Sequence, residues 1–184
     1  MVKMASSKGL KKIRRIVTDD DLRGMLQKHD RGTERSRLSR LRYLRRYFGP
    51  PRDRLLTGGT ASYFAFVELE LCYVHGAFLG TILCCQAFAE NFLGGQLIMM
   101  MEDEAAESGF STIVKSSLEH GIINKPMSKK LDELNRMRIA YGHVHVGFRS
   151  RSHMKRIIDN GFEPIKLLVD DSKKAIKTIA ELLN

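Results

Sequence analysis

The chain has 184 residues, of which 43% are hydrophobic, so it is long enough to bury one domain-sized core. Its net charge of +10 is concentrated at one end: residues 1–57 carry 17 Lys and Arg against 6 Asp and Glu, whereas residues 58–184 carry 14 against 15. Residues 1–17 lack an apolar segment followed by a cleavage site, which excludes a secretory signal. Apolar–polar alternation typical of strands is scarce, so an all-α fold is expected.

Two helices are predicted in the basic first third of the chain. The first covers residues 17–32, with Thr18 as its N-cap, acidic residues in its first turn and Gly32 after its end. The second covers residues 33–51 and ends at Gly49-Pro50-Pro51, and it carries a narrow apolar stripe. A helix, a short turn and a basic helix resemble a DNA-binding helix-turn-helix, although any basic helical hairpin shares this pattern.

Arginines cover the remaining faces of the second helix. Concentrated positive charge attracts polyanions and speeds their arrival, so nucleic-acid contact is predicted for this segment. The alternative is a solubilising tail, or an arm that packs on an acidic partner. Residues 1–57 are therefore predicted to form a basic helical extension, whose candidate nucleic-acid-binding residues are Arg35, Arg37, Arg40, Arg42, Arg45 and Arg46.

One long apolar helix is predicted from about Ala61 to Met101, buried by several neighbours that include a second subunit. Four glycines inside this range either permit close helix approach or mark a break, and the sequence leaves both open. They are Gly76, Gly80, Gly94 and Gly95.

The uncharged run from Leu71 to Ala89 is almost long enough to span a bilayer. It contains His75 and Gln86, and glutamates rather than Lys or Arg flank it, which favours a buried core or dimer helix over a membrane span. Three cysteines lie within the run without a disulfide framework, which predicts a reducing, cytoplasmic location. They are Cys72, Cys84 and Cys85.

Three more helices are predicted after the apolar segment. Residues 108–121 form a short amphipathic helix that ends at Gly121, and residues 124–143 form a longer one with Ser128 as its N-cap. A final helix is expected to begin at Asp170 or Asp171. No internal repeat is found.

The stretch "LNRMRIAYGHVHVG" (134–147) sets two arginines, Arg136 and Arg138, ahead of two histidines, His143 and His145. A neutral imidazole transfers protons near pH 7 and a guanidinium clamps phosphate oxygens, so this combination suits phosphodiester chemistry. No metal or other cofactor is expected, because the histidines lack a nearby Cys or paired carboxylate. The spacing alone equally fits a cationic helix end followed by polar turn residues.

Residues 60–147 resemble the HEPN (higher eukaryotes and prokaryotes nucleotide-binding) family. The apolar helix with "AFAENFL" (87–93) is similar to the family's helix with an embedded Glu, here Glu90. The stretch 110–138 is similar to its short helix, turn and leucine-patterned approach to an Arg. "RIAYGH" (138–143) takes the place of its Arg-x(4–6)-His motif.

The resemblance implies a HEPN-like up-and-down helical bundle over residues 58–184 that acts as a metal-independent endoribonuclease, of a toxin or defence type. It implies that Arg138 and His143 are catalytic, that RNA is the substrate, and that a homodimer joined by helix 61–101 pairs two Arg/His sets. An antitoxin or nucleotidyltransferase partner is also implied, and no membrane is involved. Arg136, His145 and Glu90 are second choices.

Two other functions are kept open by the sequence. Ile139 stands where the family usually has a polar residue, which favours a non-catalytic module that binds RNA or nucleotide or pairs with an antitoxin. The arginine-rich segment 33–48 favours a DNA-binding regulator instead. At 100° per residue, Arg138 and His143 lie about 140° apart around a helix. Arg136 with His143 and Arg138 with His145 are each seven residues apart, about two turns, and therefore share a face more closely.

Overall fold

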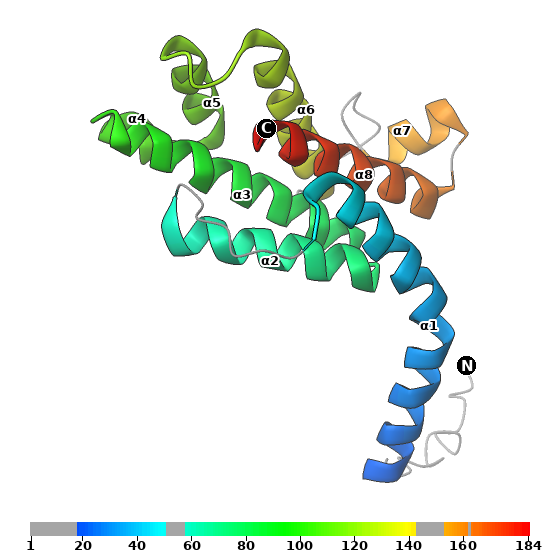
Figure 1. Cartoon of the computed structure of the whole chain (residues 1–184). Helices are drawn as coiled ribbons and strands as arrows, with labels where there is room; N and C mark the ends of the chain where they lie inside the picture. The colour runs from blue at the N-terminus through cyan, green and yellow to red at the C-terminus, as the bar shows by residue number, and fades with distance from the viewer. Residues whose placement is uncertain (1–17, 51–57, 143–152, 162) are drawn as a thin grey trace, which may run out of the picture. The chain divides into compact units, whose positions relative to one another are not determined.

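The computed structural model describes residues 18–50, 58–142, 153–161 and 163–184, and each regular element among them is a helix (Figure 1). The prediction of an all-α bundle is confirmed. The chain divides into two compact units, residues 1–36 and residues 37–184. The helices are α1 (Asp19–Phe48), α2 (Gly59–His75), α3 (Phe78–Met99), α4 (Asp103–Ala106), α5 (Phe110–Glu119), α6 (Lys125–Gly142), α7 (His153–Asn160) and α8 (Pro164–Leu182).

Helix α1 begins as the sequence predicts. The Oγ1 atom of Thr18 accepts a hydrogen bond from the Asp21 N–H at 3.2 Å, and the Asp21 carboxylate accepts one from the Thr18 N–H at 3.1 Å. This reciprocal pair satisfies two backbone donors at the start of the helix. Thr18 is therefore confirmed as the N-cap.

The prediction of two helices before residue 51 is wrong, because α1 continues through Gly32 without interruption. A glycine inside a helix costs only about 1 kcal/mol relative to alanine, which the flanking turns of a 30-residue helix compensate. Thr33 adapts to the helix by donating its hydroxyl to the His29 carbonyl at 2.8 Å. Since no turn separates two helices, the resemblance to a helix-turn-helix is lost.

The single helix predicted for 61–101 is also wrong: α2 and α3 form an antiparallel hairpin that reverses at Gly76 (Figure 1). Gly76 has φ +82°, a left-handed conformation that glycine adopts without steric cost and that commonly ends helices. Gly80 serves the close approach of the two helices, since a Cβ atom there would lie 2.9 Å from the Cys72 sulfur. Both roles proposed for the glycines are thus used, at different positions.

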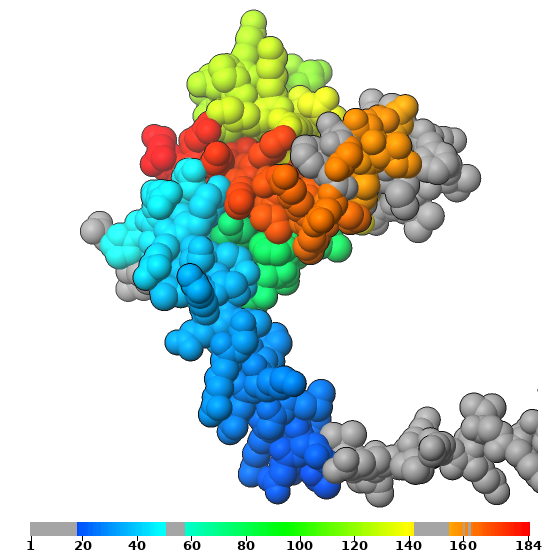
Figure 2. Space-filling view, turned by 90° about the vertical axis from the view of Figure 1, so that its right-hand side faces the viewer, coloured from blue at the N-terminus to red at the C-terminus, as the bar shows by residue number. Residues whose placement is uncertain are grey.

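Helix α3 is the centre of the 37–184 unit, and α2, α4, α5, α6 and α8 all contact it. Figure 2 shows α8 (orange to red) crossing one face of this unit, between the end of α1 (cyan) and the α5–α6 region (yellow-green). Leu44 and Phe48, from the last turns of α1, also enter the core. The largest fully buried side chains of the bundle are Tyr73, Phe88, Leu44, Leu69, Ile82, Leu93, Leu97, Ile113, Leu131, Leu134, Ile176 and Ile179.

Among the described helices, α3 is the one that is long and apolar enough to cross a membrane. Of its most apolar stretch, 44% is buried inside the structure. Core helices of bundles meet the same criteria, and the neighbours that surround α3 account for its apolar character. Low polarity on nearly every side is what a central bundle helix needs.

Two predicted helix starts are corrected. Helix α6 begins at Lys125 and is capped by Asn124, whose Oδ1 accepts from the Met127 N–H at 2.9 Å, so Ser128 lies inside the helix. Helix α8 begins at Pro164, whose fixed φ suits a first turn, so neither Asp170 nor Asp171 is a cap. The prediction for α5 is confirmed, with Gly121 at φ +71° after its end.

Candidate functional site

A cleft of about 330 Å³ opens between α3, the start of α5 and α6, and we call it the Arg138 cleft. It brings together two of the predicted site residues, Arg138 and Glu90, which lie 48 positions apart in the sequence. The residues that line it are Gln86, Glu90, Gly109, Phe110, Ser111, Thr112, Asn135 and Arg138.

Helix α6 delivers Asn135 and Arg138 to the cleft on one face, because residues three apart are neighbours on a helix. Leu134, four residues before Arg138 and next to it on the helix surface, is fully buried and anchors this side of α6 in the core. Arg136 instead is exposed, and its Nε donates to the Asp132 carbonyl at 3.3 Å on its own helix. The structure therefore separates the two arginines that the sequence left as alternatives: Arg138 lines the cleft and Arg136 does not.

Helix α3 contributes Gln86 and Glu90, four residues apart on the same face. Gln86 is only 6% exposed, and its Oε1 atom has no hydrogen-bond partner among the described residues. Glu90 is half-buried and forms no ion pair within the described part of the chain. Its carboxylate is thus available to accept hydrogen bonds from a ligand in the cleft.

The first turn of α5 forms the third wall, and it presents backbone N–H groups. The N–H groups of Thr112 and Ile113 bond to the Gly109 carbonyl, whereas those of Phe110 and Ser111 find no acceptor in the described residues. Free N–H groups and the helix dipole make such a helix start favourable for an anion. The cleft therefore combines a cationic guanidinium and a positive helix end with one carboxylate.

A hydrogen bond ties two walls of the cleft together. The Asn135 Nδ2 atom donates to the Ser111 hydroxyl at 3.1 Å, which joins α6 to the start of α5. This bond holds the Arg138 face of α6 against the N–H groups of α5. No sequence pattern singles out Asn135, although its position three residues before Arg138 places it on the same face.

His143 and His145 lie outside the described residues. Helix α6 ends at Gly142, one position before His143, so the proton-transfer half of the predicted pair is one residue beyond the described helix. Tyr141 lies in the last turn of α6 and points elsewhere: its hydroxyl donates to the Asp171 carboxylate at 2.8 Å. Tyr141 is thus a structural residue in the bundle.

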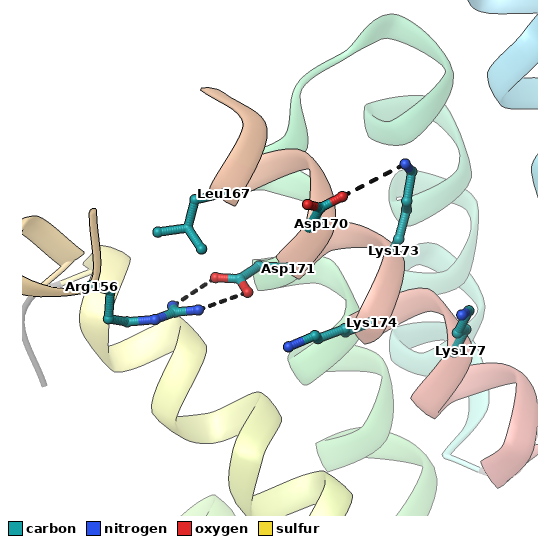
Figure 3. Close-up of a pocket in the computed structure, with 7 residues that line it drawn as sticks. All are labelled: Arg156, Leu167, Asp170, Asp171, Lys173, Lys174 and Lys177. Atoms are coloured by element: carbon teal, nitrogen blue, oxygen red, sulfur yellow. Dashed lines mark hydrogen bonds and ion pairs between the residues drawn. The ribbon is translucent and has the colours of Figure 1, made fainter. Parts of the chain in front are cut away.

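Asp171 is the centre of a second cluster, which the sequence did not predict (Figure 3). It is 1% exposed, and Arg156 of α7 binds both of its carboxylate oxygens, at 2.7 and 2.9 Å. These hydrogen bonds raise the pKa of Arg156, and burial together with the neighbouring carboxylate raises the pKa of Tyr141. The three side chains, which we call the Asp171 cluster, join α6, α7 and α8.

Beside this cluster lies a pocket of about 450 Å³ with a lysine-rich wall (Figure 3). Lys173 faces Asp170 at 3.8 Å and Lys174 faces Glu133 at 3.8 Å, so carboxylates balance much of the positive charge. None of the buried polar atoms without a partner among the described residues lies on this surface, whereas Gln86 Oε1 belongs to the Arg138 cleft. The residues that line it are Arg156, Leu167, Asp170, Asp171, Lys173, Lys174 and Lys177.

The predicted nucleic-acid-binding arginines fall into two groups. Arg40 donates its Nε–H to the Val74 carbonyl at 2.8 Å and lies 5.8 Å from the centre of the Phe78 ring. Arg45 forms a half-buried ion pair with Glu70 at 2.7 Å. These two arginines hold the end of α1 on the α2–α3 hairpin, and Arg37 is half-buried like them, while the exposed members of the set are Arg35, Arg42 and Arg46.

Within the described ranges, no three His, Cys, Asp or Glu side chains come together in a group that would hold a metal ion. Comparison of the chain with protein-family models, with curated proteins and with solved structures found no match.

Proposed function

We propose that the chain is a metal-independent endoribonuclease whose active site is the Arg138 cleft. The observation that carries the proposal is the meeting of Arg138, Glu90 and the free N–H groups of α5 in one cleft of about 330 Å³. A guanidinium and a helix start together favour a phosphate group. The resemblance of residues 60–147 to the HEPN family supports the same assignment.

In this reaction the 2′-hydroxyl of a ribose attacks the adjacent phosphorus atom, and the bond from phosphorus to the 5′-oxygen breaks. Arg138 stabilises the negative charge that gathers on the non-bridging oxygens, with the Phe110 and Ser111 N–H groups beside it. His143 is the group that transfers the proton, with Glu90 and His145 as the second choices for this role. The products are a 2′,3′-cyclic phosphate and a 5′-hydroxyl, and the protons lost and gained balance.

The test is RNA cleavage in the presence of a chelator by the wild type and by Arg138→Ala and His143→Ala. Loss of one charge-stabilising donor should lower the rate by about 100- to 1,000-fold, and loss of a general acid or base by about 100- to 10,000-fold. Arg136→Ala is the matched control, because Arg136 is exposed and lies outside the cleft. If the wild type leaves RNA intact, or if Arg138→Ala cuts as fast as Arg136→Ala, the proposal is wrong.

A non-catalytic module that binds RNA or nucleotide is the second candidate, and Ile139 is the observation that favours it. Such a module would use the same cleft, so Arg138→Ala would weaken RNA binding. Neither the wild type nor any variant would cleave RNA. An antitoxin or nucleotidyltransferase partner belongs to either function and would be tested by co-purification of the two chains.

We also propose that the active form is a homodimer joined by α2 and α3. Large apolar side chains are exposed on this hairpin: Phe64 is 59% exposed, and Tyr63 and Leu71 lie on the same helix. Contiguous apolar surface of this kind marks interaction sites. Light scattering should give twice the chain mass for the wild type and the monomer mass for Phe64→Glu combined with Leu71→Lys; a wild-type monomer would contradict the proposal.

A further inference from the structure

Gln86 is unusual within the Arg138 cleft, because it is buried without being satisfied. Its Oε1 atom has no hydrogen-bond partner among the described residues, although the residue is 6% exposed. Nearly all buried polar atoms in native proteins have a partner, and an unsatisfied one is costly unless a ligand or solvent supplies it. The position of Gln86 on the cleft wall points to a ligand.

The surroundings of Gln86 fit a flat, partly apolar ligand attached to a phosphate. Phe110, also on the wall, is 6% exposed and makes part of the wall apolar, and the volume of about 330 Å³ is at the small end of the range for small-molecule sites. The anion-binding groups lie on the same cleft: Arg138 and the N–H groups of Phe110 and Ser111. An amide, an aromatic ring and a phosphate site together match one nucleotide.

The chemistry of the amide selects among the bases. A carboxamide offers one donor and one acceptor side by side, and the major-groove edge of adenine offers the complement, an amino donor at N6 and an acceptor at N7. Guanine presents two acceptors on that edge, O6 and N7, so one of the two bonds to a carboxamide is lost. Pyrimidines have no N7. Rotation about the last torsion of Gln86 brings either atom toward the ligand, since this torsion is broad.

We propose that the Arg138 cleft is an adenine-selective nucleotide subsite in which Gln86 reads the base. The Oε1 atom accepts from the adenine amino group and the Nε2 atom donates to N7, while Arg138 and the start of α5 hold the attached phosphate. A role of this subsite in RNA cleavage depends on the proposed function, whereas its preference for adenine nucleotides does not.

Calorimetric titration of the full chain with AMP, GMP, CMP, UMP and inorganic phosphate tests the proposal. AMP should bind about 5- to 150-fold more tightly than GMP, the ratio that corresponds to one good bidentate pair. Equal affinities for AMP and GMP, or AMP no tighter than inorganic phosphate, would overturn it.

Two substitutions of Gln86 sharpen this test. Gln86→Leu keeps the size and should abolish the difference between AMP and GMP while phosphate still binds. Gln86→Glu should reduce the affinity for AMP and raise that for CMP, because a carboxylate accepts from the amino group of cytosine. If Gln86→Glu fails to fold, Gln86→Leu decides alone. Gln96→Leu is the matched control, since Gln96 lies on α3 outside the cleft, and it should leave all affinities unchanged.

The two proposals fail in different ways. RNA cleavage without an AMP preference would retain the ribonuclease and reject the role of Gln86. An AMP preference that Gln86→Leu removes, in a chain that never cleaves RNA, would retain the subsite and reject the ribonuclease. Cleavage sites mapped on an RNA with every base should then be enriched in adenine at one fixed position beside the cut.

Discussion

Replacement of Asp171 by Asn should destabilise the bundle strongly, because Asp171 is the most deeply buried charged group in the described residues. The change keeps the shape but removes the charge that Arg156 binds through two hydrogen bonds of 2.7 and 2.9 Å. It also turns one acceptor into a donor, which faces either the guanidinium or the Tyr141 hydroxyl. The loss therefore affects every bond in the Asp171 cluster.

The expected magnitude follows from burial. Removal of one partner from a buried ion pair costs about 3–5 kcal/mol, since the other charge is left without compensation. The Arg156 side chain is 28% exposed and regains some hydration, which puts the expected loss near the lower limit, at about 3 kcal/mol. The double variant Asp171→Leu with Arg156→Met should be more stable than Asp171→Asn, because neither charge remains.

Urea unfolding followed by circular dichroism measures this loss as a fall in midpoint at unchanged slope. Asp170→Asn is the matched control: the Asp170 side chain is 46% exposed and lies 3.8 Å from Lys173, so the change should stay within about 0.5 kcal/mol. Equal stability of Asp171→Asn and Asp170→Asn would refute the reasoning that Asp171 joins α6, α7 and α8.

Three further predictions concern other side chains. Gln86→Leu should raise the free energy of unfolding by about 1–3 kcal/mol by removing an unsatisfied acceptor, as urea unfolding would show; a loss of stability would contradict the account of Gln86. The Ser116 carbonyl and then the Glu102 carboxylate raise the pKa of His120. The contribution of His120 to the free energy of unfolding is therefore full below its pKa in the unfolded chain, about 6.5, and is lost as the pH rises through its pKa in the folded chain. Unfolding at pH 5.5 and pH 8.5 should therefore differ more for the wild type than for His120→Ala, and equal differences would contradict this. Burial raises the pKa of Cys84 to about 11, so iodoacetamide should modify it at pH 8 about 100-fold more slowly than a free thiol, as mass spectrometry would measure; equal rates would refute this.

Local signals in the sequence predicted the features that depend on local contacts. The capping box at Thr18 and the end of α5 at Gly121 follow from residues within one helical turn, and both are confirmed. The all-α class follows from the scarcity of the apolar–polar alternation typical of strands.

Features that depend on tertiary contacts were missed. Four glycines were equal candidates for a break between residues 61 and 101, and only the packing of α2 on α3 selects Gly76. Asp171 carries the local signal of a helix cap, but its partners Tyr141 and Arg156 lie 30 and 15 residues away. No pattern of spacing encodes such a cluster.

The candidate site was predicted in part. Glu90 and Arg138 were named from the sequence, and the structure brings both to one cleft. In the sequence, Gln86 stands out only as a polar residue inside an apolar run, and this contrast is the signal that singles it out. Asn135 and the start of α5 needed the fold, because α3, α5 and α6 meet there only after packing.

The most direct test of the central claim uses one RNA with a mapped cut and a second RNA that differs only by a 2′-deoxyribose on the 5′ side of that cut. If Arg138 stabilises attack by the 2′-hydroxyl, the wild type should cut the first RNA with a chelator present, leaving a 2′,3′-cyclic phosphate. The second RNA should stay intact at that position. Equal cleavage of the two RNAs would contradict the account.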